Sequence, residues 1–426
     1  MIILDKKLDA LEAQGKPIRV ALIGAGCTGA WVALQLATSA RGMRLAVIVN
    51  RTPARAESAL TAAGIVDFAR VSSVSQAETA MATGKTCVTD DFLVACESPS
   101  IDVIIEATGH VEFGCQAVYH AIRHGKHVVL MGAEIDASVG PILKTYADKA
   151  GVIYTYTDGD EPGVGMNLYR LVDSMGYRPV LMGQMKGFLD RYRNPQTQQG
   201  FADKNRQNPV VMSAFADGSK LALEAAIMGN ATGFIPQVRG MKGYPCAHVQ
   251  DLIKEFSPDD FVGRGLVEYS LGAAPHTGAF VLCINDHPEK RRVMSYLKMG
   301  DGPLYLFYTP YHLPPMQVAH SVARAVLAQD ATIAPGRGAV CDTVAYAKRD
   351  LKAGETLDGV GGHTCYGLVE RFEVCSKEQF LPIAISLDCR LNRSVVKDEP
   401  LRYSDVTLPV DRLCDRLRTE QSRVFQ

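Results

Sequence analysis

Five ionisable residues in three short segments could take part in acid–base or electrophilic chemistry: Asp160, Glu161, Lys186, Lys220 and Glu224. A lysine ammonium can polarise a carbonyl oxygen on which negative charge develops, and a carboxyl group can carry the proton. Lys220 stands at the start of an expected helix, where a positive charge is electrostatically unfavourable, and this favours a functional role. Lys186 ends the apolar run Val180–Met185, and it could also bind a phosphate.

The same residues have structural explanations that the sequence leaves open. Asp160 and Glu161 could cap the helix that follows them. Lys220 and Glu224 are four residues apart and could form a surface ion pair. Asp160 and Glu161 could also hold a divalent metal, although the chain lacks the His and Cys spacing of a zinc site.

A glycine pattern near the N-terminus predicts a dinucleotide-binding turn. The apolar run Ile18–Ile23 leads into GAGCTG, and a helical pattern begins at Ala30, which is the context that this turn requires. Gly24 would allow the tight turn, Gly26 would let a pyrophosphate approach the backbone, and Gly29 would let the helix pack closely on the strand. The free N–H groups of the helix start would then face the phosphates.

The end of the second expected strand predicts NADP(H) rather than NAD(H). An acidic residue at this position would bind the ribose hydroxyls and repel a 2′-phosphate. Here Asn50 and Arg51 follow Val49, with Arg55 one turn further on. An arginine can contact a phosphate through two parallel hydrogen bonds, whereas Asn50 does not repel it. The alternative is that both arginines only solvate a helix start.

Further cofactor contacts are expected in the glycine turn and at the strand ends that face the same crevice. In an open parallel sheet, ligands lie beyond the carboxyl ends of the strands. Cys27 is interpreted as a small filler residue, because no His or second Cys accompanies it. Glu134 has helix capping as its alternative role. The expected additional contacts are Cys27, Thr28, Thr108, Gly109 and Glu134.

The order of apolar runs predicts a three-part α/β chain. Strand-like runs of Val, Ile and Leu alternate with helical patterns, which indicates a doubly wound parallel sheet of the Rossmann type. An α+β substrate or oligomerisation domain and a turn-rich, β-rich C-terminal domain with a final helix would follow. The expected domains are 1–160, 161–334 and 335–426.

The boundaries of individual elements follow from the same patterns. The expected strands are Ile18–Ile23, Leu45–Val49, Val103–Glu106, His127–Met131 and Val152–Tyr156. Expected helices in this half are Trp31–Ala37, Gln116–His124 and Pro141–Ala150. Further on, Ser219 is expected to cap a helix over Leu221–Met228 that Gly229 and Asn230 end, and Val410–Arg423 is expected to form the last helix.

Composition excludes several classes of protein. A formal charge of −1 gives no electrostatic reason to bind nucleic acid or an anionic membrane. No run reaches the roughly 20 apolar residues that a membrane span needs. The charged N-terminus does not resemble a signal peptide, and Leu4, Leu8 and Leu11 indicate a short amphipathic helix there. Eleven unpaired cysteines fit a reducing compartment, so we expect a cytoplasmic protein.

Several segments resemble homoserine dehydrogenase and its relatives, among them IRVALIGAG, DVIIEATG and GKHVV. GDEP, DGSK…E…NATG, Pro310–Leu313 and the C-terminal segment resemble a narrower group, the homoserine-dehydrogenase-like oxidoreductases with a C-terminal SAF domain. That group includes a 1-deoxy-D-xylulose 5-phosphate reductoisomerase-like protein. The chain departs from homoserine dehydrogenases at Ala133-Glu134, where they carry Asn-Lys, and from the reductoisomerase-like pattern over Gly187–Gln207.

The resemblance implies NADPH-dependent reduction of a carbonyl in a small phosphorylated polyol, with or without a carbon-skeleton rearrangement. It also implies that the SAF-like segment covers an active site or builds a homo-oligomer such as a homodimer. One alternative is a homoserine or semialdehyde dehydrogenase, which Ala133-Glu134 disfavours. Another is a non-catalytic NADP(H) sensor, which the five ionisable residues would disfavour if they converge in space.

Overall fold

The computed structural model describes residues 4–425. Its N-terminal part is a seven-stranded, wholly parallel sheet in the order β3-β4-β2-β1-β5-β6-β7. The strands are β1 (Ile18–Ile23), β2 (Met43–Val49), β3 (Phe68–Arg70), β4 (Thr86–Thr89), β5 (Val103–Glu106), β6 (His127–Leu130) and β7 (Tyr154–Tyr156). The order reverses at β1, and this switch point is where open parallel sheets bind ligands.

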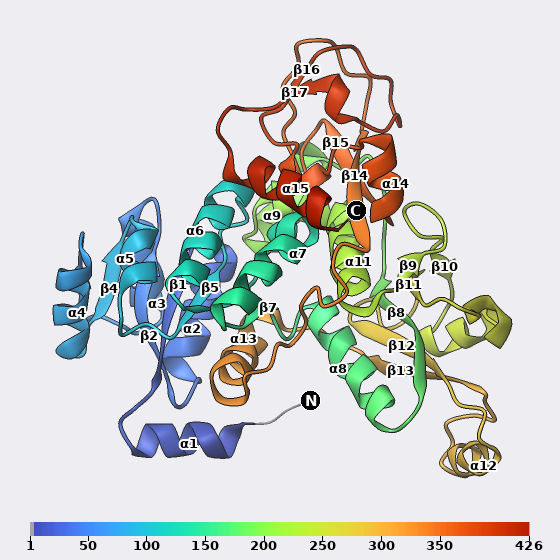
Figure 1. Ribbon diagram of the computed structural model, residues 1–426, viewed down its shortest axis with the longest axis horizontal. Helices are drawn as coiled ribbons and strands as arrows, with labels where there is room; N and C mark the ends of the chain where they lie inside the picture. The colour runs from blue at the N-terminus through green and yellow to red at the C-terminus, as the bar shows by residue number, and fades with distance from the viewer. Residues whose placement is uncertain (1–3, 426) are drawn as a thin grey trace.

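Helices cover both faces of this sheet (Figure 1). They are α1 (Asp5–Ala13), α2 (Cys27–Thr38), α3 (Pro53–Ala62), α4 (Val74–Ala82), α5 (Phe92–Glu97), α6 (Val111–Arg123) and α7 (Ala133–Ala150). The expected amphipathic N-terminal helix is present, and Leu4, Leu8 and Leu11 pack against the core on the α2 face. Within residues 4–425, no helix combines the length and the apolarity that crossing a membrane requires.

A second, mixed sheet has the order β10-β11-β8-β12-β13, with β9 beside β11. Its strands are β8 (Arg178–Lys186), β9 (Ile235–Pro236), β10 (Tyr244–Pro245), β11 (Leu266–Leu271), β12 (Ala279–Ile284) and β13 (Leu304–Thr309). The accompanying helices are α8 (Glu161–Ser174), α9 (Pro195–Asn205), α10 (Pro209–Ala216), α11 (Ser219–Thr232) and α12 (Pro288–Tyr296), with the short turns η1 (Val249–Glu255) and η2 (Pro258–Phe261). The chain then returns to the Rossmann part, where α13 (Pro314–Ala323) packs on α2 and continues into the turn η3 (Arg324–Ala328).

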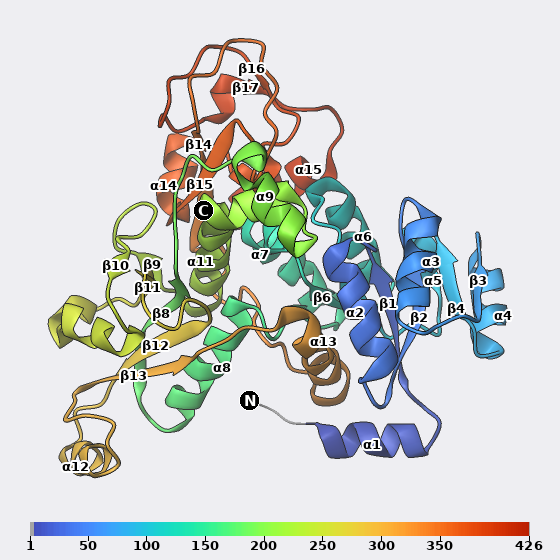
Figure 2. The same ribbon diagram turned by 180° about the vertical axis from the view of Figure 1, so that it is seen from behind.

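The C-terminal segment lies above both sheets, as Figures 1 and 2 show from opposite sides. It contains β14 (Cys341–Ala347), β15 (Cys365–Arg371), α14 (Phe372–Glu378), η4 (Ile383–Ile385), β16 (Arg390–Leu391), η5 (Tyr403–Asp405), β17 (Val406–Thr407) and α15 (Leu413–Val424). The antiparallel pair β14–β15 packs on α11, and α15 packs on α6 and α7. One continuous apolar core therefore includes residues of all three parts of the chain.

A buried ion pair, Lys348–Asp217, and a hydrogen bond from Arg418, itself paired with Asp342 inside the segment, fasten the C-terminal segment to the rest of the protein. Lys348 Nζ lies 2.8 Å from Asp217 Oδ2 and also donates to the carbonyl of Arg193 at 2.7 Å. Arg418 pairs with Asp342 and donates to the carbonyl of Ser138. Removing one partner of a buried pair leaves an uncompensated charge, so these contacts fix the segment in one position.

Several expected helices were too short: α2 begins at Cys27 and not Trp31, and α6 begins at Val111 and not Gln116. The boundaries of α7 and α11 were also wrong, for identifiable reasons. Pro141 lies inside α7, which begins at Ala133, and the backbone N–H of Ile142 donates to Gln421 Oε1 of α15 at 3.1 Å. Pro141 therefore does not mark the start of a helix, because contacts with α15 satisfy the backbone groups of the turn that this proline disturbs. The strands β3 and β4 and the helices α3, α4 and α5 were also not predicted.

In α11, Gly218 rather than Ser219 is the N-cap, in the left-handed region at φ +84°. The helix runs past Gly229 and Asn230 to Thr232. A Cβ at Gly229 would lie 2.5 Å from Cys341 Sγ, and Asn230 Oδ1 accepts from the backbone of Val340 and of Cys341, each at 2.8 Å. Both residues thus serve packing against β14 instead of ending the helix.

Candidate active site

The glycine turn has the geometry that binding a dinucleotide requires. Gly24 adopts φ +108°, and a Cβ there would lie 2.7 Å from the carbonyl oxygen of Ala107. A Cβ at Gly29 would lie 2.0 Å from the carbonyl oxygen of Gly24. A Cβ at Gly26, in contrast, would meet nothing within 4 Å, so this side of the turn is open to a ligand. The roles expected for the three glycines agree with this geometry, and α2 begins directly behind them.

Beside the turn, a cavity of about 510 Å³ is lined by Asn50, Arg51 and Arg55, the residues from which we predict a preference for NADP(H). Arg51 is exposed and lines it together with Arg55. Asn50 has a structural role, because its Oδ1 accepts from the N–H of Ala25 at 3.0 Å and so holds the glycine turn. Sequence reasoning missed Asp90, which follows β4 and lines the same cavity. Asp90 lies next to the end of β2 because β4 and β2 are neighbours in the sheet, and this order is not visible in the sequence.

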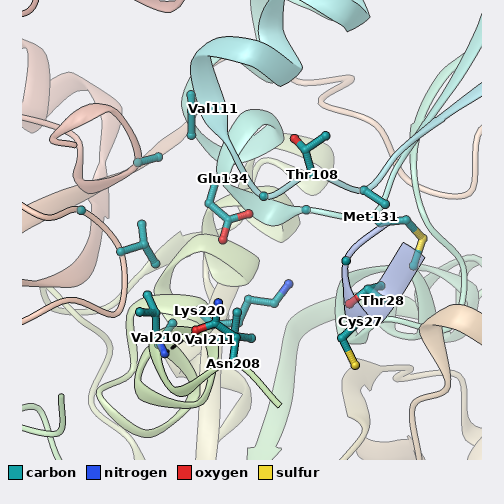
Figure 3. Close-up of a pocket in the computed structure, with 18 of the residues that line it drawn as sticks. Cys27, Thr28, Thr108, Val111, Met131, Glu134, Asn208, Val210, Val211 and Lys220 are labelled. Carbon is teal, nitrogen blue, oxygen red and sulfur yellow. Dashed lines mark hydrogen bonds between the residues drawn. The ribbon is translucent and has the colours of Figure 1, made fainter. Parts of the chain in front are cut away.

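Two further cavities continue the cleft. One of about 480 Å³ shares Gly26 and Thr108 with the Arg51 cavity, and Cys27, Thr28, Gly109 and Glu134 also line it. Figure 3 shows Glu134 pointing into this cavity, across from Cys27 and Thr28. The other, of about 710 Å³, shares Thr28 and Lys220 with it and contains the remaining four candidate catalytic residues. Except for Gly29, which is buried in α2, every residue expected to contact the cofactor thus lies along one continuous cleft.

Thr108 is held by a buried carboxyl group that sequence reasoning did not single out. Its N–H donates to Glu106 Oε1 at 2.8 Å, and its hydroxyl donates to the same oxygen. Burial raises the pKa of Glu106 to about 7 despite these two hydrogen bonds. Glu106 ends β5 at the centre of the sheet, so it fixes the Thr108–Gly109 turn that borders the cleft.

The five candidate catalytic residues converge on one buried cluster. Lys220 Nζ lies 3.1 Å from Asp160 Oδ2 and 3.1 Å from Glu224 Oε1. Lys186 Nζ lies 3.1 Å from Glu161 Oε1 and 3.7 Å from Glu224 Oε2. Glu224 therefore lies between the two ammonium groups and joins the two ion pairs into one network.

Three elements bring these residues together. Asp160 and Glu161 follow β7 at the start of α8, Lys186 ends β8, and Lys220 and Glu224 lie on α11. Asp160 is the N-cap of α8, but its side chain makes no capping hydrogen bond. The Glu224 side chain is 1% exposed, which excludes a surface ion pair. Asp160 thus occupies the expected capping position without the capping hydrogen bond, and the alternative of a surface Lys220–Glu224 pair was wrong.

Burial and charge set the proton affinities in this cluster. Burial, reinforced by the carboxylate of Glu161, raises the pKa of Glu224 from 4.5 to about 8 against the opposing effect of both lysines. Burial acts in the same direction on Asp160, yet the Lys220 ammonium, helped by the hydrogen bond from Tyr156 and by the other groups around it, holds its pKa well below the usual range. The neighbouring carboxylates outweigh desolvation at both lysines and raise the pKa of Lys186 and of Lys220. The cluster thus combines a carboxyl group with raised proton affinity, Glu224, with two lysines whose ammonium forms are favoured.

Three residues of the site were not among the expected catalytic residues, although His312 lies in the segment Pro310–Leu313 that resembles the narrower family. Tyr156 is fully buried, and its hydroxyl accepts from Lys220 Nζ at 2.9 Å and donates to Asp160. His312 Nδ1 lies 3.6 Å from Glu161 Oε1 and 2.6 Å from the hydroxyl of Thr277. Tyr156 looked like an ordinary strand residue, and His312 and Thr277 reach the site from loops that no periodic pattern places.

Asp160, Glu161 and His312 form a possible donor set for a metal ion, with ligand atoms within 4.8 Å of one another. Both carboxylates, however, already face a lysine ammonium at 3.1 Å. A divalent cation would add positive charge to a cluster that is already compensated. The charge balance therefore does not fit a metal, and we assign it no step.

Residues 159–318 match a family model described as the catalytic domain of oxidoreductase DRL. This range includes all five candidate catalytic residues and His312. No curated protein sequence matches the chain.

Similar solved structures include a homoserine dehydrogenase from Thiobacillus denitrificans, with 14% identity, 91% of this chain and 98% of that chain covered, and a TM-score of 0.44. A putative myo-inositol dehydrogenase from Sinorhizobium meliloti 1021 has 12% identity, coverage of 73% and 89%, and a TM-score of 0.42. A biliverdin reductase from Synechocystis sp. PCC 6803, in complex with biliverdin and NADP+, has 12% identity, coverage of 75% and 94%, and a TM-score of 0.38.

The glycine turn, the open cleft beyond it and the match to an oxidoreductase catalytic domain lead to one conclusion. The chain is an NAD(P)-dependent oxidoreductase. Its candidate catalytic groups lie where the cleft widens beyond the turn. Their convergence disfavours the alternative of a sensor without catalytic activity.

The raised pKa of Glu224 predicts a pH-dependent contribution to stability. Between its ordinary pKa of 4.5 and its folded-state pKa of about 8, the native protein keeps a proton that the unfolded chain releases. The contribution is therefore fully present below 4.5 and is lost as the pH rises towards 8. Urea unfolding should be measured for the parent and for Glu224→Gln across this pH range. The free energy of unfolding of the parent, relative to that of Glu224→Gln, should fall as the pH rises from 4.5 to 8. The exposed Glu373→Gln is the control, and a pH-independent difference for Glu224→Gln would contradict this assignment.

Proposed function

We propose that the chain transfers hydride reversibly between NADP(H) and the carbonyl carbon of a small organic substrate. One observation carries this proposal: Lys220 lines both the cavity next to the glycine turn and the larger cavity beyond it. Its ammonium is held at 2.9–3.1 Å by Tyr156, Asp160 and Glu224. A cation at this junction is suited to binding a carbonyl oxygen while a nicotinamide lies in the adjoining cavity.

When bound, the reduced cofactor supplies a hydride that adds to the carbonyl carbon. As the C=O electron pair moves to oxygen, Lys220 stabilises the developing negative charge and gives the oxygen a proton, which completes the alcohol. Glu224 is protonated near neutral pH and lies 3.1 Å from Lys220 Nζ, so it returns a proton to the lysine. Asp160 holds Lys220 in place through an ion pair, and Lys186, paired with Glu161, lies 3.7 Å from Glu224 and helps to position it. Oxidation of the alcohol runs through the same groups in reverse.

The preference for NADP(H) is part of this proposal and depends on the Arg51 cavity. Arg51 and Arg55 offer two positive charges at the end of β2. Asp90 lines the same cavity and opposes a phosphate there, so the two arginines must outweigh it. The exposed side chain of Arg51 is free to turn towards a 2′-phosphate.

The substrate proposed first is the small phosphorylated polyol implied by the resemblance, with 1-deoxy-D-xylulose 5-phosphate among the compounds to test. His276 and His312 line the larger cavity beside the lysines and are the groups that would face a phosphate. Phe188, Phe201 and Phe215 form an apolar side of the same cavity, which would accommodate a less polar carbonyl compound. A homoserine-type or semialdehyde substrate remains the second candidate class, and it needs no phosphate contact.

Lys220→Ala is the direct test of the proposed chemistry. With NADPH and a panel of phosphorylated and unphosphorylated ketoses and aldehydes, the variant should lower kcat by roughly two to three orders of magnitude, as loss of an oxyanion-hole donor does. NADPH affinity, measured by fluorescence titration, should change little. Lys254→Ala, in an exposed ion pair, is the matched control. Full turnover by Lys220→Ala would refute the assignment.

Arg51→Asp tests cofactor choice. The substitution should weaken NADPH binding by about 1.5–3 kcal/mol, the contribution of a hydrogen bond to a charged group, and leave NADH binding unchanged. Dissociation constants for both cofactors, from nicotinamide fluorescence, check this expectation. Equal losses for NADPH and NADH would show that Arg51 does not contact the 2′-phosphate.

A further inference from the structure

The C-terminal segment contributes part of the cofactor cleft, although nothing in its sequence resembles a cofactor site. The cavity of about 480 Å³ beside the glycine turn is lined on one side by Asp358, Gly359, Val360, Ala384 and Leu387. Figure 3 shows C-terminal chain on the far side of Glu134 from Cys27 and Thr28. A ligand in this cavity would therefore lie between the Rossmann sheet and the C-terminal segment.

This wall is built rigidly. The loop before β15 and the turn after η4 are joined by backbone hydrogen bonds from Leu357 to Cys389 at 2.8 Å and from Asp388 to Leu357 at 2.9 Å. A Cβ at Gly361 would lie 2.2 Å from the carbonyl oxygen of Val210, so the loop also packs directly on α10. The backbone of the wall is thus held in place by contacts within the protein alone.

The chemistry of the wall is apolar. The Asp358 carboxylate faces inward, because it accepts from the N–H of His363 at 2.6 Å and of Thr364 at 2.9 Å. The half-buried side chains of Val360 and Leu387 remain available to a ligand. An apolar surface opposite Glu134 suits a flat ring that carries polar groups on one edge.

The connections between cavities show which half of a dinucleotide this wall faces. None of the described C-terminal residues lines the Arg51 cavity, where the adenosine end would lie. The walled cavity shares Lys220, Thr28 and Met131 with the catalytic cavity instead. We infer that the C-terminal segment forms one wall of the nicotinamide-binding cleft, with Val360 and Leu387 in contact with the nicotinamide riboside half of the cofactor.

Binding measurements test this inference without any substrate, so they are independent of the proposed reaction. In Val360→Asp and in Leu387→Asp, a carboxylate in the wall should weaken NADPH binding at least tenfold in fluorescence titrations. Calorimetric affinities for the adenosine fragments 2′,5′-ADP and ADP should stay within twofold of the parent, because these fragments do not reach the wall. Val410→Asp, at a side chain that is 86% exposed in the same segment, is the matched control and should change neither.

Melting temperatures identify any variant that fails to fold. For such a variant, Val360→Ala or Leu387→Ala replaces the charged substitution. The alanine variants should lose less NADPH affinity than the charged ones. The inference is overturned if folded wall variants bind NADPH like the parent. It is equally overturned if they lose NADPH and the adenosine fragments to the same extent. Normal NADPH affinity in Lys220→Ala together with weak affinity in Val360→Asp would separate the wall from the catalytic cluster.

Discussion

Charge compensation inside a buried cluster is the constraint on which the rest of this structure depends. An unpaired ammonium in the interior would be strongly destabilising, so Lys186 and Lys220 each require a carboxylate at contact distance. The partners come from the start of α8, and Glu224 on α11 joins both pairs. The Rossmann sheet, which ends in β7 directly before α8, is thereby locked to the second sheet. The carboxylates keep Lys220 charged, whereas burial and the neighbouring Glu161 carboxylate raise the pKa of Glu224, and together these effects favour the state that carbonyl reduction needs.

The C-terminal segment also helps to position the buried cluster, because it packs on α11, the helix that carries Lys220. Asn230 and Gly229 connect α11 to β14, and Lys348 pairs with Asp217 just before the helix begins. A segment fixed in this way can both hold α11 and line the cofactor cleft. Cofactor binding and catalytic geometry are therefore linked through one packed unit, and the three parts of the chain act on a single site.

Local patterns predicted much of the fold and the residues of the site, but not its geometry. The glycine turn and the apolar strands β1 and β5 were readable, because each depends on neighbours along the chain. The five ionisable residues were selected for their types and local positions, whereas Tyr156, His312 and Glu106 gave no such signal. Their roles arise from contacts between distant segments. The ends of α7 and α11 were misjudged for the same reason, since proline, glycine and asparagine there serve tertiary packing.

A crystal structure of the complex with NADP+ would test most directly whether one continuous cleft delivers the nicotinamide to Lys220. The account predicts the 2′-phosphate beside Arg51, the pyrophosphate over Gly26, and the nicotinamide ring between Glu134 and the C-terminal wall. Its C4 atom should open onto the cavity that contains Lys220. A nicotinamide ring placed outside this cavity, or a C4 atom turned away from Lys220, would contradict the account.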